Sequence, residues 1–182
     1  MNIIETNIAD VLILEPRVFE DDRGYFFESF SAKYFQNEAD PVVFVQDNES
    51  KSGYGVLRGL HFQKGIYAQA KLVRVIEGRV LDVAVDIRNG SATFGQHVAV
   101  ELSGGNKRQL FIPRGFAHGF VVLSENAVFQ YKCDNYYAPQ HEGAIAWDDP
   151  ELNIDWKIDP RDIVLSEKDK KHPRLKNASC LF

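Results

Sequence analysis

His61 is a candidate general base. His61 lies near the end of the apolar string RGLHF, residues 58–62. A neutral imidazole, with a pKa of about 6.5, is the natural general base at physiological pH. Such a base needs a carboxylate to hold its tautomer, and either Asp169 or Asp47 could supply it. A lone histidine in an apolar strand is more often a core residue, so its role depends on the polar residues around it.

A lysine and a tyrosine occupy positions that otherwise look buried. In a regular strand Lys71 shares a face with Val73, and Tyr131 shares a face with Phe129. An ammonium group on an apolar face either reaches back to solvent or supplies charge to a pocket. His61, Lys71 and Tyr131 facing one lumen would provide a base, an oxyanion stabiliser and an acid. That combination suits proton abstraction next to a carbonyl.

Other polar residues have the chemistry of a ligand site, although each alone is more often a solvated surface residue. Gln46 and Asn48 are two apart and share a strand face. Tyr136 and Tyr137 could stack on a nucleobase or pack a strand end. Arginine suits bidentate phosphate contacts. Four charged residues could hold a diphosphate and sugar hydroxyls: Arg23, Glu28, Arg58 and Lys168.

Arg58 and His61 raise a geometric difficulty. They are three residues apart, so a regular strand would point them to opposite faces. Gly59 between them predicts a β-bulge that redirects one of the two side chains. Without such a bulge, one of the two assignments is wrong.

The histidine pattern argues against a metal centre. A metal site in a small β-barrel usually needs two histidines at i and i+2, with a carboxylate and a third histidine. Gln63 follows His61 at that spacing, and no His-x-His occurs in the chain. The five histidines are His61, His97, His118, His141 and His172. We therefore expect no metal.

Short β-rich runs separated by turn residues dominate the sequence. The runs 71–76 and 79–87, joined at Glu77 and Gly78, predict a hairpin, and Asn89 and Gly90 close it. Few helical stretches intervene, which predicts an all-β double-sheet sandwich or jelly roll. The other expected strands cover 42–46, 56–62, 97–102, 109–113, 120–123 and 127–133.

Helices should be short and peripheral. Ser31 can cap a helix over 31–36, and Ser166 with Asp169 resembles a capping box that opens a helix ended by Pro173. The apolar segments 3–4 and 11–14 are too short to fold alone and could pair with a sheet edge, including that of a partner subunit.

The composition narrows the class of protein. With 182 residues, 45% of them hydrophobic, the chain fits one domain, 1–182, with a sizeable core. A net charge of −5 argues against nucleic-acid binding. The two cysteines are far apart in sequence, which argues against a disulfide framework. The sequence shows no pattern of a secretory leader and no apolar run of about 20 residues that could span a membrane. We expect a cytoplasmic protein without membrane contact.

Five strings in register make the sequence recognisable. They are VQDN at 45–48, RGLHFQ at 58–63, IPRGFAHGF at 112–120, YKCDNYY at 131–137 and LSEKD at 165–169. Together they resemble the dTDP-4-dehydrorhamnose 3,5-epimerase family over essentially the whole chain. The resemblance implies a cupin-type jelly roll (a double-stranded β-helix) and no metal or organic cofactor. It also implies a homodimer that exchanges N-terminal strands within residues 1–30. Separately, we expect a C-terminal helical segment over 160–182.

The resemblance also implies a reaction and its residues. The reaction is inversion at C3 and C5 of dTDP-4-dehydro-6-deoxy-D-glucose, a step towards dTDP-L-rhamnose for cell-surface polysaccharide. His61 would be the base, Asp169 its orienting partner, Tyr131 the acid, and Lys71 the group near the C4 oxygen. Tyr137 would stack on thymine, while Arg23 and Glu28 would reach the partner's pocket. The remaining expected ligand contacts are Gln46, Asp47, Asn48, Arg58, Lys71, His118, Glu142 and Lys168.

Three alternatives remain. A relative that inverts only C3 or only C5 would use the same base and acid. A non-catalytic cupin that only binds a sugar nucleotide would tolerate loss of His61, Asp169 and Tyr131. A metal-dependent cupin oxygenase is disfavoured by the missing His-x-His.

Overall fold

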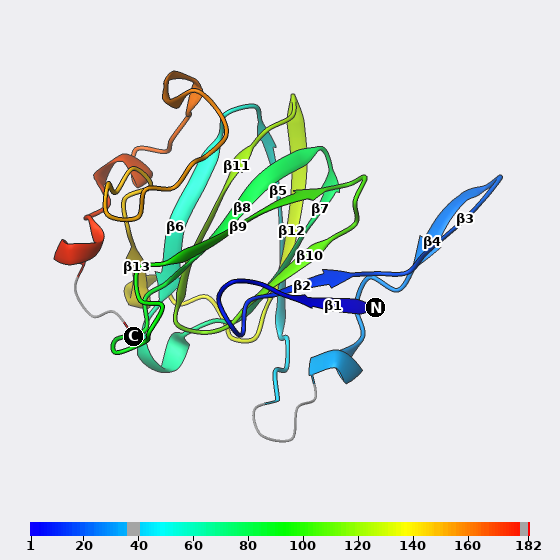
Figure 1. Cartoon of the computed structure of the whole chain (residues 1–182), viewed down its shortest axis with the longest axis horizontal. Coiled ribbons are helices and arrows are strands. Elements are labelled where there is room, and N and C mark those ends of the chain that lie inside the picture. The colour runs from blue at the N-terminus through cyan, green and yellow to red at the C-terminus, as the bar shows by residue number, and fades with distance from the viewer. Residues whose placement is uncertain (36–40, 179–181) are drawn as a thin grey trace.

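The computed structural model describes residues 1–35, 41–178 and 182, and consists of two antiparallel sheets packed face to face (Figure 1). This confirms the predicted all-β sandwich. The first sheet has the order β1-β2-β10-β7-β12-β5, and the second has the order β13-β6-β11-β8-β9. A separate hairpin consists of β3 and β4.

The strand bounds are as follows. The first sheet contains β1 (Asn2–Glu5), β2 (Leu12–Glu15), β5 (Gln46–Gly53), β7 (Lys71–Glu77), β10 (Gln109–Ile112) and β12 (Asn126–Cys133). The second contains β6 (Leu57–Gln63), β8 (Arg79–Asp86), β9 (His97–Ser103), β11 (Phe116–Val122) and β13 (Glu142–Ala144). The hairpin contains β3 (Val18–Asp21) and β4 (Gly24–Phe27).

Every helix in the described part of the chain is a short 3₁₀ turn at the periphery. The expected helix over 31–36 is η1 (Ala32–Phe35), with residue 36 outside the described residues, and the one after Ser166 is η5 (Asp169–Lys171). The others are η2 (Gly65–Tyr67), η3 (Pro139–His141), η4 (Pro160–Asp162) and η6 (Leu175–Asn177). None of the helices described is long and apolar enough to cross a membrane.

The central strands of the second sheet, β8 and β11, are buried on both faces, which explains their sequence. The inner face of this sheet packs against the first sheet, where Phe120 stacks on Phe129 at 4.1 Å between ring centroids. Its outer face is covered by the chain after β13, including Ile145 and Trp156. A strand covered on both sides needs no polar alternation. Accordingly β11 is buried throughout, and β8 is buried after its first residue.

The predicted hairpin 71–76/79–87 is wrong. β7 pairs with β10 and β12 in the first sheet, whereas β8 pairs with β11 and β9 in the second. Gly78 has φ +80°, as expected for this turn, and a Cβ there would lie 2.0 Å from the Asn126 carbonyl oxygen. A tight turn at a glycine can join two strands of one hairpin or two strands of different sheets. The turn residues alone therefore do not distinguish the two connections. The expected strand 42–46 is also displaced, because β5 begins only at Gln46.

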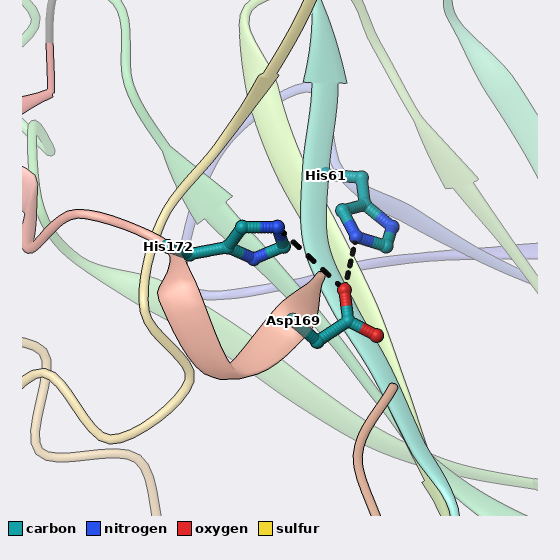
Figure 2. A group of neighbouring side chains, drawn as sticks. All are labelled: His61, Asp169 and His172. Atoms are coloured by element: carbon teal, nitrogen blue, oxygen red, sulfur yellow. Dashed lines mark hydrogen bonds and ion pairs between the residues drawn. The ribbon is translucent and has the colours of Figure 1, made fainter. Parts of the chain in front are cut away.

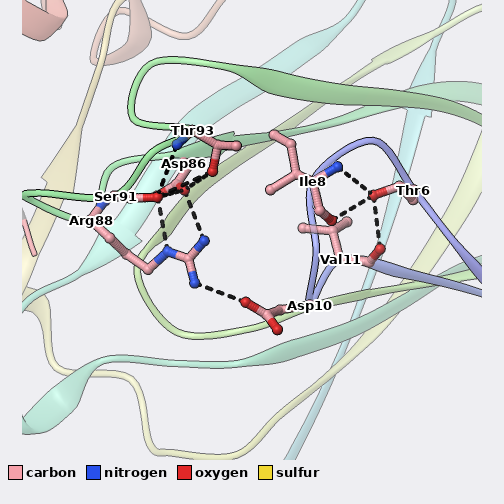
Figure 3. A network of polar contacts seen from close by, with 8 residues as sticks. All are labelled: Thr6, Ile8, Asp10, Val11, Asp86, Arg88, Ser91 and Thr93. Atoms are coloured by element: carbon pink, nitrogen blue, oxygen red, sulfur yellow. Dashed lines mark hydrogen bonds and ion pairs between the residues drawn. The ribbon is translucent and has the colours of Figure 1, made fainter.

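The N-terminal segments pair with this chain's own sheet. β1 pairs with β2, and β2 pairs with β10, which extends the first sheet at its edge. Figure 3 shows how the turn between them is fixed: the Thr6 hydroxyl bonds to the carbonyls of Ile8 and Val11, and Arg88 reaches Asp10 at 3.0 Å. The hairpin β3–β4 instead projects away from the sandwich (Figure 1).

A buried aspartate holds Arg88 in place. Asp86 is fully buried and accepts hydrogen bonds from Arg88, Ser91 and Thr93 (Figure 3). Burial alone would raise the pKa of Asp86, but these bonds outweigh it and the pKa lies below its ordinary value. The ionised carboxylate therefore ties the end of β8 to the N-terminal turn.

Candidate active site

A cavity of about 280 Å³ opens between the two sheets. Residues from β5, β6, β7, β12 and β13 line it, together with side chains from the loops that follow β6 and β12. Its lining residues are Gln46, Asn48, His61, Phe62, Gln63, Gln69, Lys71, Tyr131, Cys133, Tyr137 and Glu142. Seven of the residues expected at the site are therefore brought together from five strands and the loop after β12.

His61 has a buried carboxylate partner (Figure 2). Its Nε2 lies 2.7 Å from Asp169 Oδ1, and Asp169 is 6% exposed. The Ser166 hydroxyl donates to Asp169 Oδ2 at 2.9 Å and accepts the Asp169 backbone N–H at 3.1 Å. Burial raises the pKa of Asp169, but the bonds from His61 and Ser166 more than offset this and the net direction is downward.

The ionised carboxylate fixes the tautomer of the base. Because a carboxylate only accepts hydrogen bonds, Nε2 of His61 donates, and the neutral ring keeps its lone pair on Nδ1. Asp47 does not fill this role. It lies on the opposite, exposed face of β5, where both of its oxygens accept from Lys132 Nζ at 2.9 Å.

The bulge predicted at Gly59 is confirmed. His61 pairs with His118 and Arg58 pairs with Phe120, so two residues of β6 oppose the single Gly119 of β11. Gly59 has φ +138°, and a Cβ there would lie 2.5 Å from Gly119 Cα. Arg58 remains exposed and does not line the cavity, but its guanidinium bonds to the buried Ser52 Oγ on β5 at 3.1 and 3.2 Å.

Lys71 and Tyr131 project from neighbouring strands of the first sheet. Lys71 Nζ lies 5.8 Å from the centre of the Tyr131 ring. Burial lowers the pKa of Lys71, while the nearby negative groups, including Asp82 and Glu142, oppose this. Burial raises the pKa of Tyr131, which keeps its hydroxyl protonated at neutral pH. The pair can therefore present a positive charge and a proton donor to one ligand.

A second histidine–carboxylate pair lies deeper between the strands. His118 Nε2 is 2.9 Å from Asp82 Oδ2, and Asp82 is fully buried. Burial lowers the pKa of His118, and Asp82 acts in the opposite direction. His118 is the cross-strand neighbour of His61, so this pair supports the strand that carries the base.

The rim of the cavity is a linked set of polar groups. Tyr137 donates its hydroxyl to Glu142 Oε2 at 3.2 Å, and Lys168 forms an ion pair with the same oxygen. Gln46 accepts the Tyr137 backbone N–H at 3.2 Å and donates to Asn48 Oδ1 at 3.0 Å. These residues form one wall of donors and acceptors beside an aromatic ring.

Comparison with known proteins identifies the family. The family model described as dTDP-4-dehydrorhamnose 3,5-epimerase matches residues 5–177. This chain belongs to that family. It is 58% identical to the dTDP-4-dehydrorhamnose 3,5-epimerase of Escherichia coli (strain K12) over 172 aligned residues. The alignment covers 94% of this chain and 92% of the relative.

Solved structures of the epimerase family share the fold. The Legionella pneumophila enzyme in complex with dTDP-4-keto-L-rhamnose is 52% identical, with a TM-score of 0.92 covering 97% of this chain and 93% of that one. A 3'-monoepimerase from Streptomyces bikiniensis in complex with dTDP-quinovose is 32% identical, with a TM-score of 0.85 covering 94% and 86%. The cupin-type jelly roll expected from the sequence is thereby confirmed.

Three residues expected at the epimerase site lie elsewhere in the single chain. Arg23, at the tip of β3–β4, bonds to Asp21, and Glu28 lies 3.7 Å from Lys33. The Asp47 side chain points away from the cavity, because Gln46 and Asn48 take the inward positions of β5. None of these three side chains reaches the pocket of its own chain.

Sequence reasoning missed three residues near the site. Asp82 is an acid inside the apolar run of β8, a signal that it needs a buried partner. Gln63 bonds to the carbonyls of Tyr67 and Tyr136 and thereby fixes one wall. His172 follows Asp169 by three residues and lies beside it, because the 3₁₀ turn η5 places residues i and i+3 on the same side. The sequence spacing alone does not predict this contact.

Proposed function

We propose that this protein inverts C3 and C5 of dTDP-4-dehydro-6-deoxy-D-glucose, giving dTDP-4-dehydro-L-rhamnose. The observation that carries the proposal is the oriented His61–Asp169 pair in a cavity that also contains Lys71 and Tyr131. A single ketone at C4 acidifies the C–H bonds on both sides, so one base and one oxyanion site can serve both inversions if the ring pivots between them.

The proposed roles follow from the state of each group. His61 removes a proton through Nδ1, and Asp169 stabilises the imidazolium that forms. The buried Lys71 ammonium stabilises the negative charge on the C4 oxygen. Tyr131 returns a proton on the opposite face. Each step leaves His61 with one proton more and Tyr131 with one fewer, and exchange with water restores both.

The ligand would be held along the polar wall of the cavity. Tyr137 offers its ring to the thymine base, and Arg58 offers a guanidinium to the diphosphate. Gln46 and Asn48 point into the cavity and would bond to the ligand. The further contacts proposed are Lys71, His118, Glu142 and Lys168, with Asp47 contributing through the outer side of β5.

We propose in addition that two copies complete each other's pockets through the hairpin β3–β4. The hairpin exposes Phe19 at 51% and Phe26 at 72%, apolar area that a partner subunit would cover. This arm would bring Arg23 and Glu28 to the partner's cavity. The exchange would involve residues 18–28, because β1 and β2 pair within the chain.

Mixed dimers test the exchange. His61→Ala and Arg23→Ala proteins are unfolded together and refolded. If Arg23 acts in the partner's pocket, half of the dimers contain one intact pocket, and roughly a quarter of wild-type activity returns. No recovery would refute the exchange, with the two variants refolded separately as controls.

The test of the activity is incubation with dTDP-4-dehydro-6-deoxy-D-glucose in deuterium oxide. NMR should show inversion and deuterium at both C3 and C5. Deuterium and inversion at one carbon would indicate a mono-epimerase, which the higher identity to the 3,5-epimerases disfavours. Binding of dTDP without exchange would overturn the proposal in favour of a non-catalytic cupin.

We propose that the protein works in the cytoplasm, a reducing compartment. A free cysteine thiol fits this location. Cys133 is a buried free thiol in the cavity wall. Burial raises its pKa to about 11, so the thiol is protonated and inert at neutral pH.

A further inference from the structure

His172 lies against the His61–Asp169 pair, and its only contact with Asp169 is a long ion-pair distance rather than a hydrogen bond (Figure 2). Its Nε2 is 3.7 Å from Asp169 Oδ1, and its ring meets that of His61 edge-on at 5.3 Å. The side chain is 7% exposed, yet neither ring nitrogen has a hydrogen-bond partner among the described residues. Buried polar atoms without partners are rare and call for an explanation, such as a bound ion.

The three side chains offer a donor set for a transition-metal ion. One nitrogen from each histidine and one oxygen of Asp169 lie within 4.8 Å of one another. Metal–ligand bonds of about 2.0–2.2 Å in a tetrahedral zinc site put neighbouring ligand atoms about 3.3 Å apart. The two separations from the Asp169 oxygen, 2.7 Å and 3.7 Å, lie on either side of that value. Ring movements that bring the donor atoms, all within 4.8 Å of one another, to about this separation would form the site.

The donors are in the protonation states that a metal requires. Burial lowers the pKa of His172, which favours the neutral imidazole with a free lone pair. Asp169 is the ionised member of the cluster. Of the two lysines that flank Asp169 in sequence, Lys168 forms an ion pair with Glu142 and Lys170 forms one with Glu167. Two imidazoles and one carboxylate suit Zn²⁺ and Co²⁺, whereas Mg²⁺ prefers oxygen ligands.

We propose that His61, Asp169 and His172 form an inhibitory site for Zn²⁺ and similar divalent transition-metal ions. Three protein ligands leave a fourth position for water, reachable because the His61 side chain is 30% exposed. The ion takes the place of the proton on His61 Nε2, and that proton is then carried on Nδ1. His61 can no longer accept a proton from a ligand, so turnover stops while the ion is bound.

The experiment compares metal binding and inhibition in matched variants. Metal-free wild-type protein, His172→Gln and the control His97→Gln are titrated with CoCl₂ without substrate and read by visible absorption. ZnCl₂ inhibition is then measured, with MgCl₂ as a control and a chelator to restore activity. His97 lies on β9, outside the cluster.

We expect one Co²⁺ per chain with the intense visible bands of tetrahedral cobalt in the wild type and in His97→Gln. In His172→Gln we expect these bands to be lost and the half-inhibitory Zn²⁺ concentration to rise at least about tenfold. His172→Asn is the second variant if His172→Gln folds poorly.

An absence of cobalt bands in the wild type would overturn the proposal. So would bands or zinc sensitivity in the His172 variants equal to those of the wild type. The inhibitory part rests on the proposed role of His61 as base, whereas the cobalt titration does not. If the protein lacks epimerase activity, the titration still decides whether the metal site exists.

Discussion

The substitution Asp169→Asn removes the negative charge that stabilises the protonated ring of His61. The 2.7 Å contact places the carboxylate and the ring at direct hydrogen-bond distance. Unit charges about 4 Å apart interact by about 4 kcal/mol at an effective dielectric constant of about 20. With the proton half transferred in the transition state, about 2 kcal/mol of stabilisation is lost, which is about a 30-fold fall in kcat.

The orientation of the new amide sets the upper limit of the loss. If its oxygen faces His61 and its NH₂ faces Ser166, the tautomer is kept and only the charge effect applies. If its NH₂ faces His61, the ring is held in the wrong tautomer, and losses of about 10⁴-fold are then expected. We therefore expect kcat to fall between about 30-fold and about 10⁴-fold.

The assay is the initial rate of deuterium uptake by NMR, with circular dichroism and a thermal melt to verify the fold. Ser166→Ala is the matched control. It removes the hydroxyl bond to Asp169 Oδ2 but leaves the charge, and should cost less than about tenfold. An Asp169→Asn rate within threefold of wild type would refute the role of the carboxylate.

Four further predictions can be tested in the same way. Lys71→Ala and His61→Ala should each retain the fold, as circular dichroism would show, and lose most of the turnover measured by initial rates. For Lys71→Ala, which removes the oxyanion donor, the expected loss is about 100- to 1,000-fold. Because burial lowers the pKa of Lys71, wild-type activity should fall on the alkaline side below the pH at which an ordinary lysine deprotonates, which a pH–rate profile would detect. Tyr131→Phe should continue to exchange substrate protons with deuterium while losing inverted product, and loss of exchange equal to that of inversion would contradict its role as the acid. Asp86→Asn should lower the melting temperature at neutral pH. Since the pKa of Asp86 is lowered by folding, its stabilisation is present above the unfolded pKa of about 3.9 and is lost as pH falls through the folded value, so melts of the two proteins should converge in acid.

The sequence by itself determined the features that depend on local backbone geometry. Side chains alternate along a strand, so Lys71 and Tyr131 could be assigned to the inner face from their apolar neighbours. Gly59 predicted a bulge because Arg58 and His61 could not otherwise share a pocket, and β6 and β11 contain it. The five family strings added the reaction and the proposed roles, which local geometry alone does not contain.

Only the tertiary structure decided which distant groups meet. His61 and Asp169 are 108 residues apart, and spacing could not choose between Asp169 and Asp47. The glycine turn after β7 was compatible with a hairpin, but packing sends β8 into the opposite sheet. Asp82 and His172 gained meaning only when the fold placed them beside His118 and Asp169. The physical reason is that periodicity and turn chemistry act over a few residues, whereas strand pairing and burial are set by how the whole chain fills one core.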